Sequence, residues 1–150
     1  MKKYEFTGET KKTGVFGDIT VKRIKAKDGE LGGWIEKEEN LPHEGEAWVC
    51  GEAEVYGNAK VYGNAKVCGN AEVCEISHIL VIGPIGSRNE FTTFFKDNDN
   101  EITVKCGCFL GKINEFLDKV QKTHAGNKYA LVYRDSAEIA KKQIDIGLVK

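Results

Sequence analysis

The most regular pattern of apolar and polar residues in the chain lies between Gly45 and Cys74. It consists of five six-residue units, GEAWVC, GEAEVY, GNAKVY, GNAKVC and GNAEVC, each beginning with glycine. Within a unit the A-x-V triplet alternates, so alanine and valine point inward and the residue between them points outward. The inward set is Ala47, Ala53, Ala59, Ala65 and Ala71 with Val49, Val55, Val61, Val67 and Val73, and the outward set is Trp48, Glu54, Lys60, Lys66 and Glu72. A period of six fits neither a helix nor a long strand, and it predicts a parallel β-helix.

The residues before the repeat predict two strands and a cap. YEFTG (4–8) and ITVKRIKAK (19–27) have the composition of short strands around a turn at residues 14–18. GELGGWIEKEENLP (29–42) predicts an irregular cap over the open end of the β-helix, because a short stack of repeats needs covered ends. The glycine and the Asn or Glu that follow each repeat strand predict a tight corner, since glycine adopts positive φ freely and asparagine tolerates it.

The apolar pattern changes after residue 78. EFTTFF (90–95) and EITVKC (101–106) predict strands of an antiparallel sheet, and ILVIGPIG (79–86) is either its first strand or a continuation of the repeat. Two amphipathic helices should follow, with a break at Gly126 and Asn127. Their buried faces are Ile113, Phe116, Leu117 and Val120 in the first helix, and Tyr129, Tyr133, Ala137, Ala140 and Ile144 in the second.

Several of these segments together resemble a known group of proteins. ELGGWIEKEENL, the G-N-A-x-V units, IGPIGSRN and CGCFLG are similar to small hexapeptide-repeat proteins encoded by phages and prophages of intestinal and clostridial bacteria. The resemblance covers nearly the whole chain and implies a left-handed β-helix with three hexapeptides in each turn. It brings no catalytic residues with it, because a fold does not fix a function.

The expected fold is therefore mainly β with an α+β C-terminal part. N-terminal strands and a cap (1–44) precede a short left-handed parallel β-helix (45–78), which is followed by a small region of three antiparallel strands and two helices (79–150). Three units in each turn place residues 18 apart above one another, so Cys50 stacks on Cys68. This pair is either a redox switch or, as we expect, two small apolar corner residues. Five cysteines without a CxxC pair favour reduced thiols over a disulfide framework or a zinc site.

Composition narrows the classes of partner. The 22 basic and 23 acidic residues give a net charge of -1, so no global field attracts a nucleic-acid polymer or an anionic membrane. No apolar run approaches the roughly 20 residues of a membrane span, and the first residues lack the apolar core of a signal peptide. We therefore expect a cytoplasmic protein, and the resemblance to phage-encoded proteins implies the cytosol of a host cell. Neighbouring copies would cover the ends of so short a β-helix, which predicts a homo-oligomer, either a trimer or a dimer.

The best candidate for chemistry is GPIGSRN (83–89), between two apolar strands. Backbone N–H groups around Gly86 and Asn89, the Ser87 hydroxyl and the Arg88 guanidinium suit a phosphate group. The alternative is a structural turn with a solvated arginine, and the sequence leaves both open. It is neither a Walker A sequence nor GxGxxG.

A second glycine-rich segment, CGCFLGK (106–112), precedes the first helix. We expect it to be a compact strand-to-helix connection, although Lys105 beside it and the helix N-terminus also suit an anion. His124 follows the same helix and reaches a ligand if that helix end faces the Gly86–Asn89 turn. The predicted ligand-binding residues are thus Gly86, Ser87, Arg88, Asn89, Lys105 and His124, with no catalytic residue, metal or cofactor.

Three classes of function remain, in decreasing order of preference. The first is a non-catalytic binding protein that sequesters a small anionic ligand, such as a cyclic or linear nucleotide signal of the bacterial defence response, as a phage-encoded sponge would. The second is an assembly protein in which Trp34, Trp48 and flat β-helix faces make subunit contacts. The third is a hexapeptide acyltransferase that uses His78, at an outward position of the extended repeat register, as general base.

Overall fold

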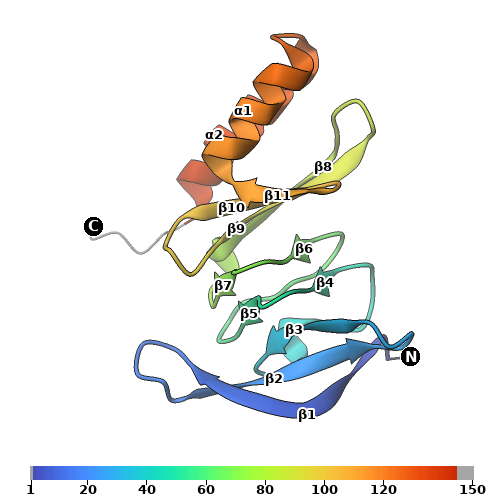
Figure 1. The fold of residues 1–150 in the computed structure, drawn as a ribbon, viewed down its shortest axis with the longest axis vertical. Coiled ribbons are helices and arrows are strands. Elements are labelled where there is room, and N and C mark those ends of the chain that lie inside the picture. Colours follow the sequence, from blue (N-terminus) through green and yellow to red (C-terminus); the bar gives the residue numbers. More distant parts are fainter. Residues whose placement is uncertain (1, 145–150) are drawn as a thin grey trace. The chain divides into compact units, whose positions relative to one another are not determined.

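The computed structural model describes residues 2–144 (Figure 1). These residues form two compact units that meet in sequence between Ile76 and Ser77, and each unit is described by itself. Together the described residues contain eleven strands in three sheets and two α-helices, so the protein has a mixed α and β fold. Neither helix is long and apolar enough to cross a membrane.

The first unit begins with an antiparallel meander. Strand β1 (Tyr4–Thr13) pairs with β2 (Ile19–Ala26) around the predicted turn at residues 14–18, and β2 pairs with β3 (Leu31–Ile35). The segment predicted as an irregular cap therefore contains a strand, which is followed by a short 3-10 helix, η1 (Glu38–Asn40).

The repeat supplies four strands of two residues each. These are β4 (Trp48–Val49), β5 (Glu54–Val55), β6 (Lys66–Val67) and β7 (Glu72–Val73). Trp48 pairs with Lys66 and Glu54 with Glu72, both in parallel, which confirms the predicted stacking of residues 18 apart. The ten predicted inward alanines and valines are at most 2 % exposed. Gly45, Gly51, Gly57, Gly63 and Gly69 all have positive φ, as the predicted corners require.

The prediction of a left-handed parallel β-helix is wrong. Strands β5 and β7 extend the N-terminal meander into one five-stranded sheet, in the order β1-β2-β3-β5-β7, while β4 and β6 form a separate pair. Residues 59–62 of the third unit form no strand. The repeat thus forms two pairs of short parallel strands, β5 with β7 and β4 with β6, and the parallel pairing of β5 continues into β3 instead of into a further turn of repeat. Within residues 2–144 the strands build no closed or solenoid β-helix.

Asn40 supplies the backbone partners that the third repeat unit otherwise lacks. This residue is fully buried, and its Nδ2 donates to the carbonyl oxygens of Gly57 and Ala59 at 3.3 and 2.9 Å. Its own carbonyl oxygen accepts from the N–H of Val61 at 2.9 Å. Because buried backbone groups must be paired, one side chain and one carbonyl of η1 take the place of a missing strand.

The cysteine pair in the repeat is a disulfide. Cys50 and Cys68 stack as expected, with Cα atoms 4.6 Å apart, and their sulfurs are bonded. The prediction that these thiols are reduced is therefore wrong, because the stacking brings the two Cα atoms within the usual range for a disulfide. Among the described residues, Cys74, Cys106 and Cys108 take no part in a disulfide.

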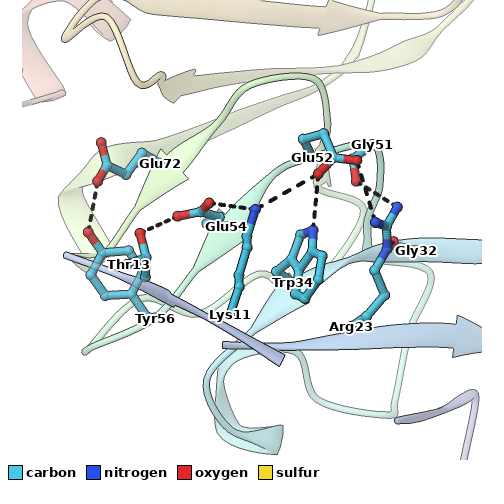
Figure 2. Close-up of polar contacts among 10 residues, drawn as sticks. All are labelled: Lys11, Thr13, Arg23, Gly32, Trp34, Gly51, Glu52, Glu54, Tyr56 and Glu72. Carbon is cyan, nitrogen blue, oxygen red and sulfur yellow. Dashed lines mark hydrogen bonds and ion pairs between the residues drawn. The ribbon is translucent and has the colours of Figure 1, made fainter. Parts of the chain in front are cut away.

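A polar network around Trp34 joins the meander to the repeat (Figure 2). The indole lies between the Lys11 Nζ, 4.5 Å from the ring centroid, and the Arg23 guanidinium at 5.0 Å. Its Nε1 donates to Glu52 at 3.2 Å, and Glu52 also pairs with Lys11 and Arg23 at 3.8 and 3.4 Å. Glu54 accepts from Thr13 and lies 2.9 Å from the Lys11 Nζ. The charged groups of this network thus neutralise one another.

The second unit contains a four-stranded antiparallel sheet in the order β11-β10-β9-β8. Its strands are β8 (Ile79–Ile85), β9 (Glu90–Lys96), β10 (Ile102–Cys106) and β11 (Phe109–Lys112). Of the two open interpretations of ILVIGPIG, the structure thus selects the strand. CGCFLGK holds a hairpin turn and the fourth strand, so its interpretation as a simple strand-to-helix connection was incomplete.

Two helices complete this unit, α1 (Ile113–His124) and α2 (Lys128–Gln143). The predicted break between them is present, and Ala125 ends α1 in the left-handed backbone conformation. The Asn127 side chain caps α2 by accepting hydrogen bonds from the N–H groups of Tyr129 and Ala130. The helices and the sheet share one core, with buried members Phe94, Ile102, Val104, Phe116, Val120, Ala130, Tyr133, Ala137, Ala140 and Ile144.

The inward positions of the repeat should not tolerate bulk. Ala59 is 1 % exposed, so Ala59→Leu inserts a larger side chain into filled space and should lower the free energy of unfolding by about 1 to 3 kcal/mol. Lys60→Leu is the matched control at an exposed position and should change it by less than about 0.5 kcal/mol. Urea unfolding compares the two, and equal stabilities would contradict the inward assignment.

Asn40→Ala should destabilise the first unit by about 2 to 3 kcal/mol, because it leaves the carbonyls of Gly57 and Ala59 and the N–H of Lys37 without side-chain partners. Asn58→Ala removes the same side chain from an exposed corner of the repeat and serves as control. Thermal unfolding of both variants checks this, and a midpoint for Asn40→Ala as high as that of the control would refute the role of Asn40.

Candidate functional site

A cavity of about 310 Å³ opens in the second unit. Three segments form its walls: the start of β9 with the turn before it, the β10–β11 turn, and α1 from Phe116 to its end. Tyr133 of α2 also contributes. The lining residues are Ser87, Arg88, Glu90, Cys106, Gly107, Cys108, Phe109, Phe116, Lys119, Val120, Thr123, His124 and Tyr133.

The turn that carries Ser87 and Arg88 is held close to α2. The N–H of Asn89 donates to the Gly86 carbonyl at 3.2 Å, and both residues have positive φ. A Cβ at Gly86 would lie 1.8 Å from the Tyr133 hydroxyl oxygen, so any larger residue would clash there. Glycine at 86 therefore lets the turn approach Tyr133, while the Ser87 and Arg88 side chains stay exposed.

Two cations line the cavity without a carboxylate partner. Among residues 2–144, neither Arg88 nor Lys119 forms an ion pair. Glu90 is the one acidic side chain of the lining, and His124 lies at the end of α1. Arg88, Lys119 and Glu90 therefore give the lining one net positive charge, which favours an anion.

Aromatic rings and hydroxyl groups complete the lining. The rings of Phe109 and Phe116 lie 5.7 Å apart, Tyr133 packs edge-on against Phe116 at 5.5 Å, and His124 stacks on Tyr133 at 5.9 Å. Burial, with smaller effects from Cys106 and Glu90, raises the pKa of Tyr133 to about 12. The Tyr133 hydroxyl is therefore protonated at neutral pH, and it is already hydrogen bonded to Cys106.

The cavity does not contain an assembled nucleophile and base. Cys106 Sγ accepts a hydrogen bond from Thr92 at 3.3 Å, whereas Cys108 is exposed. In the part of the chain that the structure describes, neither thiol is hydrogen bonded to His124, whose ring instead contacts Tyr129 and Tyr133. A cysteine nucleophile would need such a base or another source of activation.

Three of the six predicted ligand-binding residues come together in the cavity: Ser87, Arg88 and His124. The end of α1 and the Gly86–Asn89 turn thus line the same space. Gly86 and Asn89 shape the turn without lining the cavity, and the Lys105 Nζ donates to the Gly107 carbonyl instead. His78 is not at an outward position, since it lies in a 3-10 helix (Ile76–His78) and is only 7 % exposed.

Sequence reasoning missed Lys119, Thr123 and Tyr133 as cavity residues. Lys119 and Thr123 lie on the same side of α1 as Phe116 and Val120, at the i, i+3, i+4 and i+7 spacing of one helix face. Because His124 at the end of this helix is a predicted ligand-binding residue, the same periodicity could have indicated Lys119 and Thr123 as residues of the site. Tyr133 was assigned to the buried helix face, where it does lie, and only its tertiary contact with the turn shows its second role.

A charge cluster fixes the start of α1, the helix that forms one wall of the cavity. The Lys112 Nζ lies 2.8 Å from Asp97, 2.9 Å from Asp99 and 3.2 Å from Glu101. Asp97 is 1 % exposed and also accepts from Thr103 at 2.6 Å. Although burial alone would raise the pKa of Asp97, the hydrogen bonds from Lys112, Thr103 and two backbone N–H groups lower it. The β9–β10 turn is thereby attached to the residue that precedes α1.

Comparison of the chain with protein-family models, with curated proteins and with solved structures found no match. Within residues 2–144, no group of three or more His, Cys, Asp and Glu side chains could hold a metal ion.

Asp97 should make the stability of the second unit depend on pH. Because its pKa is lower in the folded protein, its ionised form stabilises the fold above the unfolded pKa of about 3.9, and this contribution is lost as the pH falls through the folded pKa. Asp97→Asn should destabilise by about 2 kcal/mol at pH 7, and its stability should approach that of the wild type in acid.

The matched control is Asp118→Asn, at an exposed position of α1. Urea unfolding between about pH 2 and pH 7 measures the effect. A constant difference between wild type and Asp97→Asn over this range would contradict the assignment.

Proposed function

We propose that this chain is a non-catalytic binding protein that holds a small anionic ligand in the cavity of its second unit. One observation supports this most directly: Arg88 and Lys119, which have no carboxylate partner among the described residues, line the same cavity. A cation that is already paired has little to offer an anion, whereas these two retain their full hydrogen-bonding capacity.

The lining offers the contacts that a phosphate group requires. Arg88 can bind two phosphate oxygens at once with its planar guanidinium, and Lys119 adds a second positive charge. Ser87 and Thr123 supply hydroxyl donors from two different segments. Charged and neutral donors that converge from several elements favour phosphate over a simple halide, because phosphate accepts several hydrogen bonds at once.

A nucleotide is the class of ligand to test first. Phe109, Phe116 and Tyr133 give the cavity an aromatic side on which a base could stack, next to the cations that would bind its phosphate. About 310 Å³ is near the lower end of small-molecule sites, which suits a mononucleotide better than a larger compound. The resemblance to phage-encoded repeat proteins adds a biological role, in which the protein sequesters a nucleotide signal of bacterial defence.

The acyltransferase alternative lacks the exposed general base that it requires. His78, the only histidine that the repeat register had indicated for that role, is buried in a 3-10 helix. His124 lines the cavity, but among the described residues it is not hydrogen bonded to Cys106 or to Cys108. We therefore expect the ligand to be released unchanged.

Arg88→Ala should weaken the binding of phosphate and of mononucleotides by about 10- to 150-fold, because charge-assisted hydrogen bonds contribute roughly 1.5 to 3 kcal/mol. The fold should be unaffected, since the Arg88 side chain is exposed. Isothermal titration calorimetry measures the affinities, and chromatography of the recovered nucleotide tests for chemical change.

Arg134→Ala is the matched control, because Arg134 is an exposed arginine of the same unit that does not line the cavity. Equal affinities for the two variants would contradict a role for Arg88. A nucleotide converted to product would instead show that the protein is an enzyme.

A further inference from the structure

The cavity contains two free thiols in different environments. Cys106 and Cys108 flank Gly107 at the tip of the β10–β11 hairpin. Cys106 is half-buried, accepts a hydrogen bond from Thr92 and lies beside the buried Tyr133. Cys108 is exposed and makes no hydrogen bond within residues 2–144. A small molecule in the cavity can therefore reach the Cys108 sulfur more easily than that of Cys106.

The positive charge of the same cavity should favour the approach of anionic reagents to Cys108 over uncharged ones. Arg88 and Lys119 line it with unpaired positive charges, against the single carboxylate of Glu90. Electrostatic attraction raises the local concentration of anions in such a cleft. A thiol beside the cations should thus meet negatively charged disulfides more often than uncharged ones of the same intrinsic reactivity.

We propose that Cys108 is a site of mixed-disulfide formation with small anionic disulfides, and that the attached group fills the cavity. The Cys108 thiolate, its proton having gone to solvent, attacks one sulfur of the disulfide. A new bond forms between Cys108 Sγ and that sulfur, the disulfide bond of the reagent breaks, and the other half leaves as a thiolate. No further oxidant is required. That the modification also blocks ligand binding rests on the proposed function above.

The reaction can be followed by stopped-flow absorbance on the full chain with Cys50 and Cys68 still bonded. Dithiobis(nitrobenzoate), a dianion, and dithiodipyridine, which is uncharged, both release a coloured thiolate or thione. The ratio of their rate constants at Cys108 measures the preference for an anion. Arg88→Ala combined with Lys119→Ala should lower this ratio about tenfold, and high salt should lower it in the wild type.

Cys108→Ser should remove the fast phase, whereas Cys106→Ser should keep it. Arg134→Ala combined with Lys122→Ala, which removes two exposed charges outside the cavity lining, should leave the ratio unchanged. Persistence of the fast phase in Cys108→Ser would overturn the proposal. So would an unchanged ratio after loss of both Arg88 and Lys119.

A separate experiment tests whether modification of Cys108 prevents ligand binding. Protein modified at Cys108 with nitrobenzoate should lose binding of phosphate and adenosine monophosphate, whereas protein that carries a methylthio group there should retain it. Undiminished binding by the nitrobenzoate adduct would overturn the claim that the attached group fills the cavity. Failure of unmodified protein to bind either compound would refute the proposed function, while the rate ratios would still decide the anion preference of Cys108.

Discussion

The first unit depends on a supply of backbone partners for repeat strands that are too short to stand alone. A two-residue strand gains its hydrogen bonds only from the layer before it and the layer after it. At the first layer the repeat has no preceding copy. Strand β3 serves on one side, where the Trp34 N–H donates to Ala53 and the Glu36 N–H to Val55. Asn40 serves on another side with its amide and its carbonyl. Since unpaired buried backbone groups cost free energy comparable to lost hydrogen bonds, the stack requires the non-repetitive segment in front of it.

This requirement explains why an antiparallel meander leads into a parallel stack. Strand β3 pairs with β2 on one edge and with β5 on the other, so it carries both pairing modes at once. The side chains reinforce the junction: Trp34 of β3 lies between the cations of β1 and β2, and Glu52 of the repeat binds the indole and both cations (Figure 2). Gly32 and Gly33 allow the close approach, because a Cβ on either would lie within 3 Å of the repeat.

Most parts of the fold that the sequence predicts correctly have a period. The alternation of alanine and valine fixes the inward positions, the spacing of six fixes the stacking of Cys50 on Cys68, and the helical spacing fixes both helices. The closed β-helix was wrong because the end of a repeat array depends on segments that do not repeat, and nothing periodic marks the pairing of β3 or the role of Asn40. Strand β11 was missed because its sequence, FLGK, is short and contains glycine. For the cavity, Ser87, Arg88 and His124 could be predicted from residue type, whereas Tyr133 could not, because its contact with Gly86 exists only in three dimensions.

The distribution of paired and unpaired charges separates the structural surfaces from the candidate site. Around Trp34, both cations form ion pairs with carboxylates, and these ion pairs link neighbouring strands. At the start of α1, Lys112 is likewise surrounded by three carboxylates. Arg88 and Lys119 differ, because folding brings them into one cavity without giving either a partner among the described residues. Like charges placed in the same cleft repel each other, so this arrangement is unfavourable for the protein alone. An anion held between them would remove the repulsion and gain both attractions, and for this reason we propose the cavity, and not the repeat, as the ligand-binding part of the molecule.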